Sequence, residues 1–393
     1  MEKQKNIPSL RFPEYNINWE IKKLSELSEN GFSNGAFNDP KKVGSGFRII
    51  NVKDMYVDGT INVDNLTKVA LDEKEFLKNR VEWGDIFFTR SSLVKEGIAH
   101  SNVNLNYFDD LTFDGHLIRM RPIKQFHSPI FLYYNFSTIN ARLQFIKRGK
   151  TTTMTTIGQE DIASVEIILP NLQEQNKIAS FLTKVDEKLT ALKKKKELLE
   201  QYKKGVMQQI FSQELRFKDD DGNDYPEWEE KDLGTFSKIT TGSSNREDSN
   251  LDGEYTFFDR SQDIRSSNRY LFDAEAIIVP GEGQEFIPKF FVGKFDLHQR
   301  TYAIMDFGIN IGKYLFYFIS YNSNHLNSHA VGSTVKSLRL PMFEKMPIKL
   351  PCIKEQVKIA DFISTIDNKI SYCQSQIEKA EVWKKGLLQQ MFC

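Results

Sequence analysis

The sequence predicts an α+β protein in which two pseudo-symmetric mixed α/β domains are joined by two long helices that form an antiparallel coiled coil. Three observations predict this fold class. The chain has 393 residues, more than one ordinary core holds. A 44-residue segment occurs twice, and both copies carry apolar residues at alternating spacings of four and three. The apolar content of 40% is enough to fill cores, which excludes a globally disordered chain.

The internal repeat sets the order of the elements. Residues 169–212 match residues 350–393 without a gap, at an offset of 181, and 18 of the 44 pairs are identical. A second repeat opens each half, with LRF and WE motifs in residues 10–24 and again in residues 215–233. The regions enclosed by these repeats are barely alike. A repeated frame around divergent inserts suggests one task performed twice on different targets.

Each 44-residue copy predicts a helix of about 40 residues, or roughly 60 Å. Pro170 and Pro351 stand just before the helices, where a missing N–H costs little. Packing of each helix on its own domain is an alternative, but two similar apolar stripes favour helix-on-helix packing. The predicted coiled-coil seam consists of Ile178, Leu182, Val185, Leu189, Leu192, Lys196 and Leu199 in the first copy, and Ile359, Ile363, Ile366, Ile370, Cys373, Ile377 and Ala380 in the second.

The variable regions predict mixed α and β structure. Strands are expected where β-branched and aromatic residues cluster, at 81–90, 116–123 and 165–170, and again at 274–281, 301–307 and 346–350. Amphipathic helices are expected at 129–146 and 312–326, and a solvated linker at 213–232. The predicted domains are 1–168 and 213–349 (the latter with its linker), and the long helices occupy 169–212 and 350–393.

No catalytic motif emerges from the sequence. Gly149-Lys150-Thr151 resembles the end of a phosphate loop, but the required earlier glycine is replaced by Gln144. No GxGxxG opens a βαβ unit, and the absence of any Pro-Pro pair excludes the signature of amino-methyltransferases. Short Asp/Glu-x-Lys fragments are expected by chance in a chain that is 27% charged.

Metal, disulfide and membrane classes are also disfavoured. The three cysteines all lie in the last 42 residues, without a CxxC pair, so neither a zinc site nor a disulfide framework is predicted. No apolar run is long enough to span a bilayer, and the N-terminal MEKQKN lacks the apolar part of a signal peptide. We therefore expect a cytoplasmic protein.

The distribution of charge is the positive signal. The net charge is zero, yet residues 115–159 hold seven basic residues and no acidic one, and residues 307–343 hold three basic residues and no acidic one. Each stretch contains a hydroxyl cluster, at 151–156 and 332–337, that can hydrogen-bond phosphates. A solvated face is the alternative. The corresponding places of both stretches in the repeat favour DNA binding instead.

The repeated motifs resemble those of the specificity subunits of Type I restriction-modification systems. The motifs are LPxxxEQxKIAxF, the KKGxxQQxF tail, the LRF and WE openings, and GST before the second long helix. The tandem arrangement covers nearly the whole chain and is more specific than any one motif. One position departs from the pattern: at residues 151–153 the first copy has TTT where the second has GST.

The resemblance implies that each variable region is a target-recognition domain that reads one half of a split, double-stranded DNA target. It implies two modification subunits that dock on the helical region and carry S-adenosylmethionine for N6-adenine methylation, and restriction subunits that use ATP and Mg. This chain itself would hold no cofactor and no catalytic residue. The helices would act as a spacer that holds the two domains on the order of one DNA turn, about 34 Å, apart.

Candidate contacts follow from these interpretations. The predicted DNA-binding residues are Arg90, Ser91, Arg119, Arg121, Lys147, Arg148, Lys150, Thr152 and Thr153 in the first domain, and Arg260, Arg265, His298, Arg300, Ser333, Thr334, Lys336 and Arg339 in the second. The predicted partner-binding residues are Lys203, Gln208, Gln209, Lys384, Gln389 and Gln390. Two other functions stay open at this point: a methyltransferase or nuclease that acts alone, and a coiled-coil scaffold that binds no DNA.

Overall fold

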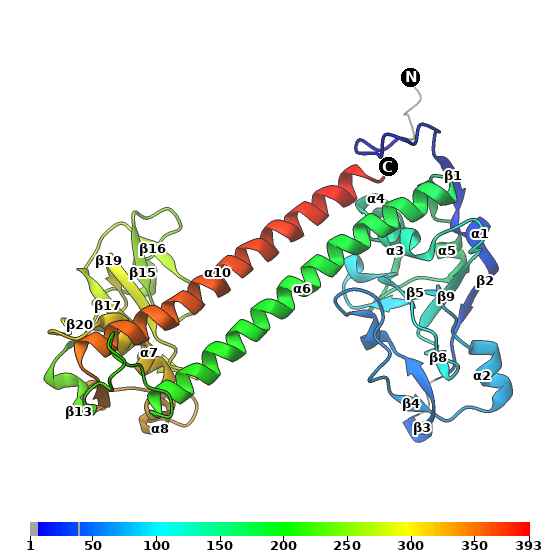
Figure 1. The fold of residues 1–393 in the computed structure, drawn as a ribbon. Coiled ribbons are helices and arrows are strands. Elements are labelled where there is room, and N and C mark those ends of the chain that lie inside the picture. Colours follow the sequence, from blue (N-terminus) through cyan, green and yellow to red (C-terminus); the bar gives the residue numbers. More distant parts are fainter. Residues whose placement is uncertain (1–6, 38–39) are drawn as a thin grey trace. The chain divides into compact units, whose positions relative to one another are not determined.

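The computed structural model describes residues 7–37 and 40–393, so the MEKQKN segment lies outside the described residues. The chain divides into two compact units (Figure 1). The first unit comprises Met1–Leu192 and Gln376–Cys393, and the second comprises Lys193–Ser375. Two long helices, α6 (Leu172–Phe211) and α10 (Ile353–Gln390), contribute one part to each unit. Among the described residues, no helix has the length and apolarity that a membrane crossing requires.

In its described residues, the first unit holds three small sheets besides the two-stranded pair β1-β12. Their strand orders are β2-β9-β5-β7, β4-β3-β8 and β10-β11-β6. The central strand β5 is buried along its whole length, which fits its continuous apolar and aromatic sequence. The elements are β1 (Glu20–Lys23), α1 (Leu24–Leu27), β2 (Ser28–Asn34), β3 (Val43–Ile50), β4 (Lys68–Val69), α2 (Glu73–Asn79), β5 (Ile86–Thr89), β6 (Ser91–Ser92), β7 (Ser101–Val103), β8 (Leu111–Phe113), β9 (Leu117–Pro122), α3 (Pro129–Ser137), α4 (Ile139–Arg148), β10 (Lys150–Thr151), β11 (Thr155–Thr156), α5 (Gln159–Ala163) and β12 (Glu166–Leu169).

The second unit builds its domain around one six-stranded sheet with the order β14-β20-β17-β19-β15-β16. A two-stranded pair, β18-β21, lies outside that sheet. The elements are β13 (Glu229–Asp232), β14 (Lys238–Thr241), β15 (Tyr255–Phe258), β16 (Arg265–Ser267), β17 (Phe272–Pro280), β18 (Glu282–Gly283), β19 (Lys289–Leu297), β20 (Thr301–Met305), α7 (Gly312–Tyr321), α8 (Ser323–His329), β21 (Lys336–Ser337), α9 (Leu340–Glu344) and β22 (Pro347–Leu350).

The strand that enters each domain pairs with the strand that leaves it. In the first unit β1 runs antiparallel to β12, with Glu20 opposite Leu169. In the second unit β13 runs antiparallel to β22, with Glu229 opposite Leu350. Each variable region is therefore closed at its base by a two-stranded sheet, and the long helix follows directly after it.

Two of the predicted helices are each divided into two. The segment 129–146 forms α3 and α4, separated at Thr138, whose backbone is extended and whose hydroxyl accepts a 3.5 Å bond from the Ala141 N–H. The segment 312–326 forms α7 and α8, separated at Asn322. The Thr138 hydroxyl caps α4, which explains why the first apolar pattern yields two helices. The six predicted strands are confirmed as β5, β9, β12, β17, β20 and β22.

The long helices run antiparallel in both units. In the first unit Lys384 of α10 pairs with Asp186 of α6, with 2.6 Å between Nζ and Oδ1. In the second unit Lys203 of α6 pairs with Asp367 of α10, also at 2.6 Å. The two pairs are the same interaction, because Lys384 and Asp367 are the repeat copies of Lys203 and Asp186.

The predicted seam residues differ in what they contact. Most are buried, whereas five are only half-buried: Leu192, Lys196, Leu199, Ile370 and Ala380. Ile178, Leu182 and Val185 belong to the core of the first unit, beside strand and short-helix residues as well as the end of α10. Helix-on-helix packing and packing on the helix's own domain, which the sequence presented as alternatives, therefore occur together in this part of α6.

The end of each long helix completes the core of a unit. Phe211, at the end of α6, lies in the core of the second unit and contacts Tyr314 and Phe318 edge-to-face. Phe392, just beyond α10, lies in the core of the first unit, with its ring centroid 5.2 Å from that of Phe131. The last residues of the chain thus stabilise the domain formed by its first half.

A buried carboxylate anchors each domain opening to its helix. Glu174 accepts hydrogen bonds from Arg11 (2.7 Å at Nε and at Nη2) and from the Trp19 indole (3.3 Å). The carboxylate is 1% exposed, so the paired guanidinium and indole replace its lost hydration. Its copy, 181 residues later, makes the equivalent bonds: Glu355 accepts from Arg216 and Trp228. The arginine of the LRF motif, the tryptophan of the WE motif and the glutamate of the EQ motif therefore meet in one contact in each unit.

Candidate nucleic-acid interface

Each hydroxyl cluster forms a hairpin at the same place in its domain. In the first unit β11 pairs with β10 and also with β6, the short strand that follows β5. In the second unit β21 pairs with β18, the short strand that follows β17. β5 and β17 are equivalent, since each is paired on both sides within the main sheet of its domain. The residues of both hairpin tips, 152–154 and 332–335, are exposed.

A tight turn lies next to each hairpin, and backbone hydrogen bonds show that the two turns are equivalent. Arg90 donates its N–H to the carbonyl of His116, and Gly281 donates its N–H to the carbonyl of Arg300. In the same way the Arg90 carbonyl accepts from Ile157, as the Gly281 carbonyl accepts from Leu338. His116 and Arg300 thus occupy equivalent positions, and so do Ser91 and Glu282. Sequence comparison misses this match because the side chains differ.

In the second unit the turn and the hairpin border a cavity of about 610 Å³. Three residues predicted to bind DNA line it: Arg260, His298 and Arg300. Arg246 and Glu282 line it too, and neither was predicted from the sequence. Glu282 was not predicted because acidic residues were taken to disfavour DNA contact.

Glu282 accepts hydrogen bonds from two arginines of the cavity. Arg300 Nη1 lies 2.9 Å from both carboxylate oxygens, and Arg260 Nη1 lies 3.3 Å from one of them. His298 Nδ1 accepts the backbone N–H of Arg300 at 3.1 Å, which leaves the ring hydrogen on Nε2. Burial lowers the pKa of His298, so the ring is neutral at neutral pH.

The corresponding place in the first unit carries different chemistry. Arg90 is exposed and Ser91 is half-buried, and His116 Nδ1 lies 2.7 Å from Asp114 Oδ1. Among the other predicted residues, Lys150 lies 3.5 Å from Asp161 and its side chain is 76% exposed. Thr152, Thr153 and Lys147 are exposed as well, on the hairpin tip and at the end of α4. These side chains are accessible to a ligand.

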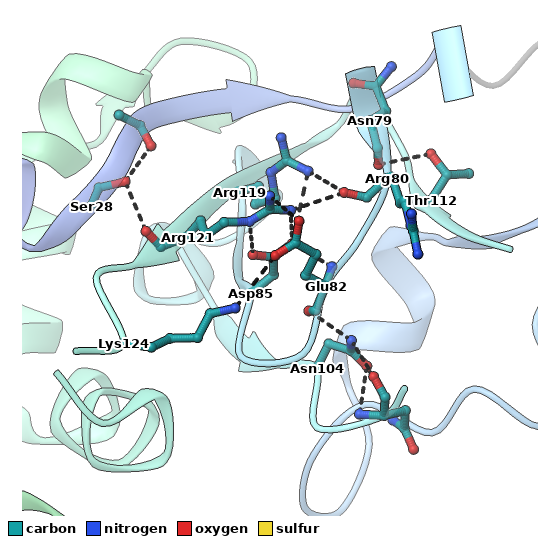
Figure 2. Close-up of polar contacts among 12 residues, drawn as sticks. Ser28, Asn79, Arg80, Glu82, Asp85, Asn104, Thr112, Arg119, Arg121 and Lys124 are labelled. Atoms are coloured by element: carbon teal, nitrogen blue, oxygen red, sulfur yellow. Dashed lines mark hydrogen bonds and ion pairs between the residues drawn. The ribbon is translucent and has the colours of Figure 1, made fainter. Parts of the chain in front are cut away.

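Two predicted arginines are engaged inside the first domain (Figure 2). Arg121 binds Asp85 through Nε (2.7 Å) and Nη2 (2.9 Å), and binds Glu82 through Nη1 (2.7 Å). Arg119 donates to the Arg80 carbonyl at 2.8 Å, and burial lowers the pKa of its guanidinium. Asp85 is fully buried and needs these partners. The network lies at the far end of β5 from the hairpin, and both guanidinium groups are engaged within the domain, so DNA contact by these two arginines stays a prediction.

Arg148 and Arg265 are also held by the chain itself. Arg148 donates to the Ser164 hydroxyl (2.8 Å), to the Ser164 carbonyl (3.0 Å) and to the Gln144 carbonyl (3.2 Å). Arg265 Nε lies 3.8 Å from Asp259, and Nη1 lies 3.5 Å from the Ser249 hydroxyl. In the second hairpin region Ser333, Thr334 and Arg339 are exposed, and Lys336 is half-buried. DNA contact by the residues of this group stays a prediction.

The predicted partner-binding residues divide into two classes. Lys203 and Lys384 are bound to the opposite long helix, as described above, and each ammonium also lies over a tyrosine ring, Tyr317 or Tyr134. Those tyrosines donate to the same aspartates, at 2.7 and 2.8 Å. The glutamines, in contrast, are exposed on both helices: Gln208, Gln209, Gln389 and Gln390. Within residues 7–37 and 40–393, no group of three or more His, Cys, Asp or Glu side chains is placed to hold a metal ion.

Comparison with known proteins relates both units to one protein family. The family model described as the Type I restriction modification DNA specificity domain matches residues 16–201 and again residues 225–382. A protein described as a putative type I restriction enzyme MjaX specificity subunit, from Methanocaldococcus jannaschii, is 25% identical over 98% of this chain and 95% of its own length. The EcoDI specificity subunit of Escherichia coli is 28% identical over 39% of this chain and 34% of its own length.

The fold is also found among solved structures. The crystal structure of a Type I restriction-modification S subunit from M. genitalium aligns over 98% of this chain and 99% of its own, with a TM-score of 0.65 and 14% identity. A chain from a structure described as the complex assembly and conformational transition of the type I R-M system aligns over 95% of this chain and 97% of its own, with a TM-score of 0.53 and 14% identity. At these identities the likeness concerns the fold alone.

Proposed function

We propose, from the premise that this chain belongs to the family of Type I restriction-modification DNA specificity proteins, that each of its two units reads one half of a split DNA target. The chain is the DNA-specificity subunit of such a system, and in this family catalysis belongs to other subunits. The division of the target between the units is our inference. It rests on the position of the hairpin and turn, which recurs in both units with different side chains.

Differences between the two sites support separate half-sites. The repeated segments form a frame, whose buried contacts, such as those of Glu174 and Glu355, occur in both units. The residues bordering the hairpins differ between the units: His116 stands where the second unit has Arg300, and Ser91 where it has Glu282. Base identity is read by hydrogen bonds to base edges, so different donors and acceptors at one position imply different bases. The exposed hydroxyl and lysine side chains at the hairpin tips are suited to phosphate contacts that set the register.

The experiment that tests this division is an exchange of one variable region. Residues 20–168 are replaced by the equivalent region of another family member, and methylated sequences are mapped in a host that carries the hybrid with its modification subunit. The junctions fall at the paired strands β1 and β12, so the closed base of the domain moves as a unit. One half of the methylated sequence should change and the other should stay. A change in both halves would contradict the assignment.

We further propose that two modification subunits dock on the repeated outer face of the long helices. The exposed glutamines belong to this face, and so do Tyr202 and its repeat copy Trp383, which are 52% and 49% exposed. Trp383 stacks edge-to-face on Phe181, with 6.1 Å between centroids. A half-exposed aromatic ring backed by another ring, as at Trp383, is a typical anchor of a protein interface. Two copies of one face accommodate two copies of one partner.

Stoichiometry gives the test of docking. Native mass measurement of the purified complex should find two modification subunits with the wild-type chain, one with Tyr202→Ala or with Trp383→Ala, and none with the double variant. Lys194→Ala, an exposed position on the same helix α6, should leave two. Retention of two subunits by the double variant would place docking elsewhere. We assign S-adenosylmethionine, ATP and Mg to the partner subunits, in keeping with the absence of nucleotide-binding motifs from this sequence.

A further inference from the structure

The charged side chains that line the cavity of the second unit present donors, because their carboxylates are already occupied. The carboxylate of Glu282 accepts from Arg300 and Arg260. The carboxylate of Asp259, which also lines the cavity, accepts from the Ser261 N–H at 2.8 Å and from the Ser261 hydroxyl. Both acids are therefore occupied by groups of the domain itself.

The donors, by comparison, remain available. Arg300 uses only Nη1 on Glu282, and the described residues offer no acceptor to its Nε or Nη2. The side chains of Arg260 and Arg300 are 55% and 58% exposed at the cavity mouth. The Nε2–H of His298 adds a neutral donor beside them. A ligand that binds these three side chains must therefore present acceptors.

From this arrangement we infer that the second unit reads a guanine, with Arg300 as the base-reading residue and Glu282 as the positioning residue that fixes its guanidinium. The inference rests on the proposed reading of a DNA half-site. In the major groove guanine presents two adjacent acceptors, N7 and O6, which match the two parallel donors of a guanidinium edge. Cytosine presents a donor there, and adenine presents one donor beside one acceptor.

The carboxylate also argues for a base rather than a phosphate. Glu282 adds a negative charge against the guanidinium groups, which weakens their attraction for an anionic phosphate. A guanine edge carries no net charge, so the same carboxylate repels it far less. By holding Arg300 in one conformation, Glu282 also reduces the side-chain entropy that is lost when the base is bound.

The first unit provides an internal contrast. At the positions equivalent to Arg300 and Glu282 it has His116 and Ser91, so the guanidinium–carboxylate pair is absent from that turn. A guanine contact of this kind is therefore assigned to one half of the target only. Substitutions at Arg300 should leave the other half of the target unaffected.

The test uses the complex of this chain with its modification subunits. The wild-type target is first defined by mapping methylated sequences, and binding is then measured for DNA duplexes that carry each single base-pair change in both halves. Four variants are compared with the wild type: Arg300→Ala, Arg300→Lys, Glu282→Gln and the matched control Glu285→Gln, whose residue is exposed and three positions away.

The expected result is position-specific. Arg300→Ala should lose about 5- to 150-fold in discrimination at one G·C pair of one half, and nothing in the other half. Arg300→Lys keeps the charge but loses the planar fork, so it should relax the same position. Glu282→Gln should relax it in part, and Glu285→Gln should behave as wild type.

Three outcomes would overturn the inference. The half read by the second unit could contain no G·C pair. Arg300→Ala could weaken binding to all duplexes equally, with Arg300→Lys restoring it, which is the behaviour of a phosphate contact. Failure of the wild-type complex to recognise any sequence would overturn the proposed function itself, and this inference with it. A loss of folding is recognised separately, because a variant that still holds its modification subunits has retained the long helices.

Discussion

The two units share their frame and differ in their reading sites. Glu174 and Glu355 hold an arginine and a tryptophan in the same way, 181 residues apart. At the hairpin and turn the backbone hydrogen bonds are equally well matched, but His116 faces one site and Arg300 the other. The repeat is thus retained in buried contacts and in backbone geometry, and is lost in the exposed side chains beside the hairpins.

The free-energy cost of a substitution explains why the buried contacts are retained while the exposed side chains differ. A buried carboxylate without its partners costs several kcal/mol, so a change at Glu174 or Arg11 would endanger folding. An exposed side chain at the hairpin contributes little to stability, because its removal leaves neither a cavity nor an unpaired charge. The reading site can therefore change its specificity without disturbing the frame that presents it.

The largest effect is expected from the ends of the long helices. Phe392→Ala should destabilise the first unit by about 3–5 kcal/mol, and Phe211→Ala should do the same to the second, because each ring fills a core. Hydrogen exchange read by mass spectrometry should localise each loss to one unit. If Phe392→Ala left the amides of the first unit protected, the C-terminal residues would not be part of that core.

Exposed aromatic residues on the same helix provide the control for this comparison. Tyr372→Ala removes a ring that is 66% exposed on α10 and should change the free energy of unfolding by less than about 1 kcal/mol. A similar loss for Tyr372→Ala and Phe392→Ala would mean that shortening any aromatic side chain of α10 is enough to destabilise the protein.

The second prediction concerns the buried carboxylates. Glu174→Ala and Glu355→Ala should each cost about 2–4 kcal/mol, since each deprives a mostly buried arginine of its buried carboxylate partner. Chemical denaturation gives the measurement, and Trp228, the only tryptophan of the second unit, reports on that unit by fluorescence. Glu14→Ala removes one partner of an exposed pair 3.6 Å from Lys177 and should cost little. Costs that differ several-fold between Glu174 and Glu355 would show that the frame contacts are not equivalent.

Much of the frame was predictable because the spacing of apolar residues and the internal repeats in the sequence indicate buried contacts directly. The alternating spacing of four and three located both long helices, whose observed bounds lie within three residues of the predicted ones. The break at Thr138 was not predicted, since an apolar pattern continues through it and only the capping bond reveals it. The roles of LRF, WE and EQ in one contact were also hidden, because their residues are far apart in sequence.

The sequence did not reveal what surrounds the predicted reading residues, and the reason is electrostatic. Counting basic residues selected Arg119 and Arg121, yet the carboxylates of Asp85 and Glu82, from outside the acid-free stretch, are folded against Arg121. A stretch without acids in sequence is not a surface without acids in space. The same count omitted Glu282, whose negative charge positions two arginines.

A third prediction concerns a residue that differs between the two units. His127 stands next to Ser128, whose N–H binds Gln175, and Asn310 stands next to Ile311, whose N–H binds Gln356. Burial lowers the pKa of His127 to about 4. The unfolded chain binds a proton near pH 6.5 and the folded chain does not, so stability falls as the pH drops from about 6.5 towards 4, by up to about 1.4 kcal/mol per unit.

Exchanging this residue should transfer the difference. His127→Asn should remove this acid sensitivity from the first unit, so that wild type and variant diverge below pH 6.5 while their offset stays constant above pH 7.5. Denaturation across pH 4–8, with hydrogen exchange to separate the units, provides the measurement. An unchanged pH profile would mean that His127 is protonated in the folded protein.

The smallest effect is expected from the lysine–aspartate–tyrosine contacts between the long helices. Lys203 with Asp367 and Lys384 with Asp186 have the same Nζ–Oδ1 distance, 2.6 Å, and all four side chains are between 21% and 34% exposed. Solvent at this exposure screens the charges, so a double-mutant cycle with Lys→Met and Asp→Asn should give a coupling of about 1 kcal/mol for each pair. Because the Lys ammonium also lies over the tyrosine ring, Tyr317→Phe and Tyr134→Phe should keep most of this coupling, since they remove only the hydroxyl bond to the aspartate. Equal coupling in both units is the specific expectation, because repeat copies of the same side chains make both pairs. A coupling near zero in one unit would mean that its helices are held by apolar contacts alone, and that the repeat retains this ion pair without equal use in both places.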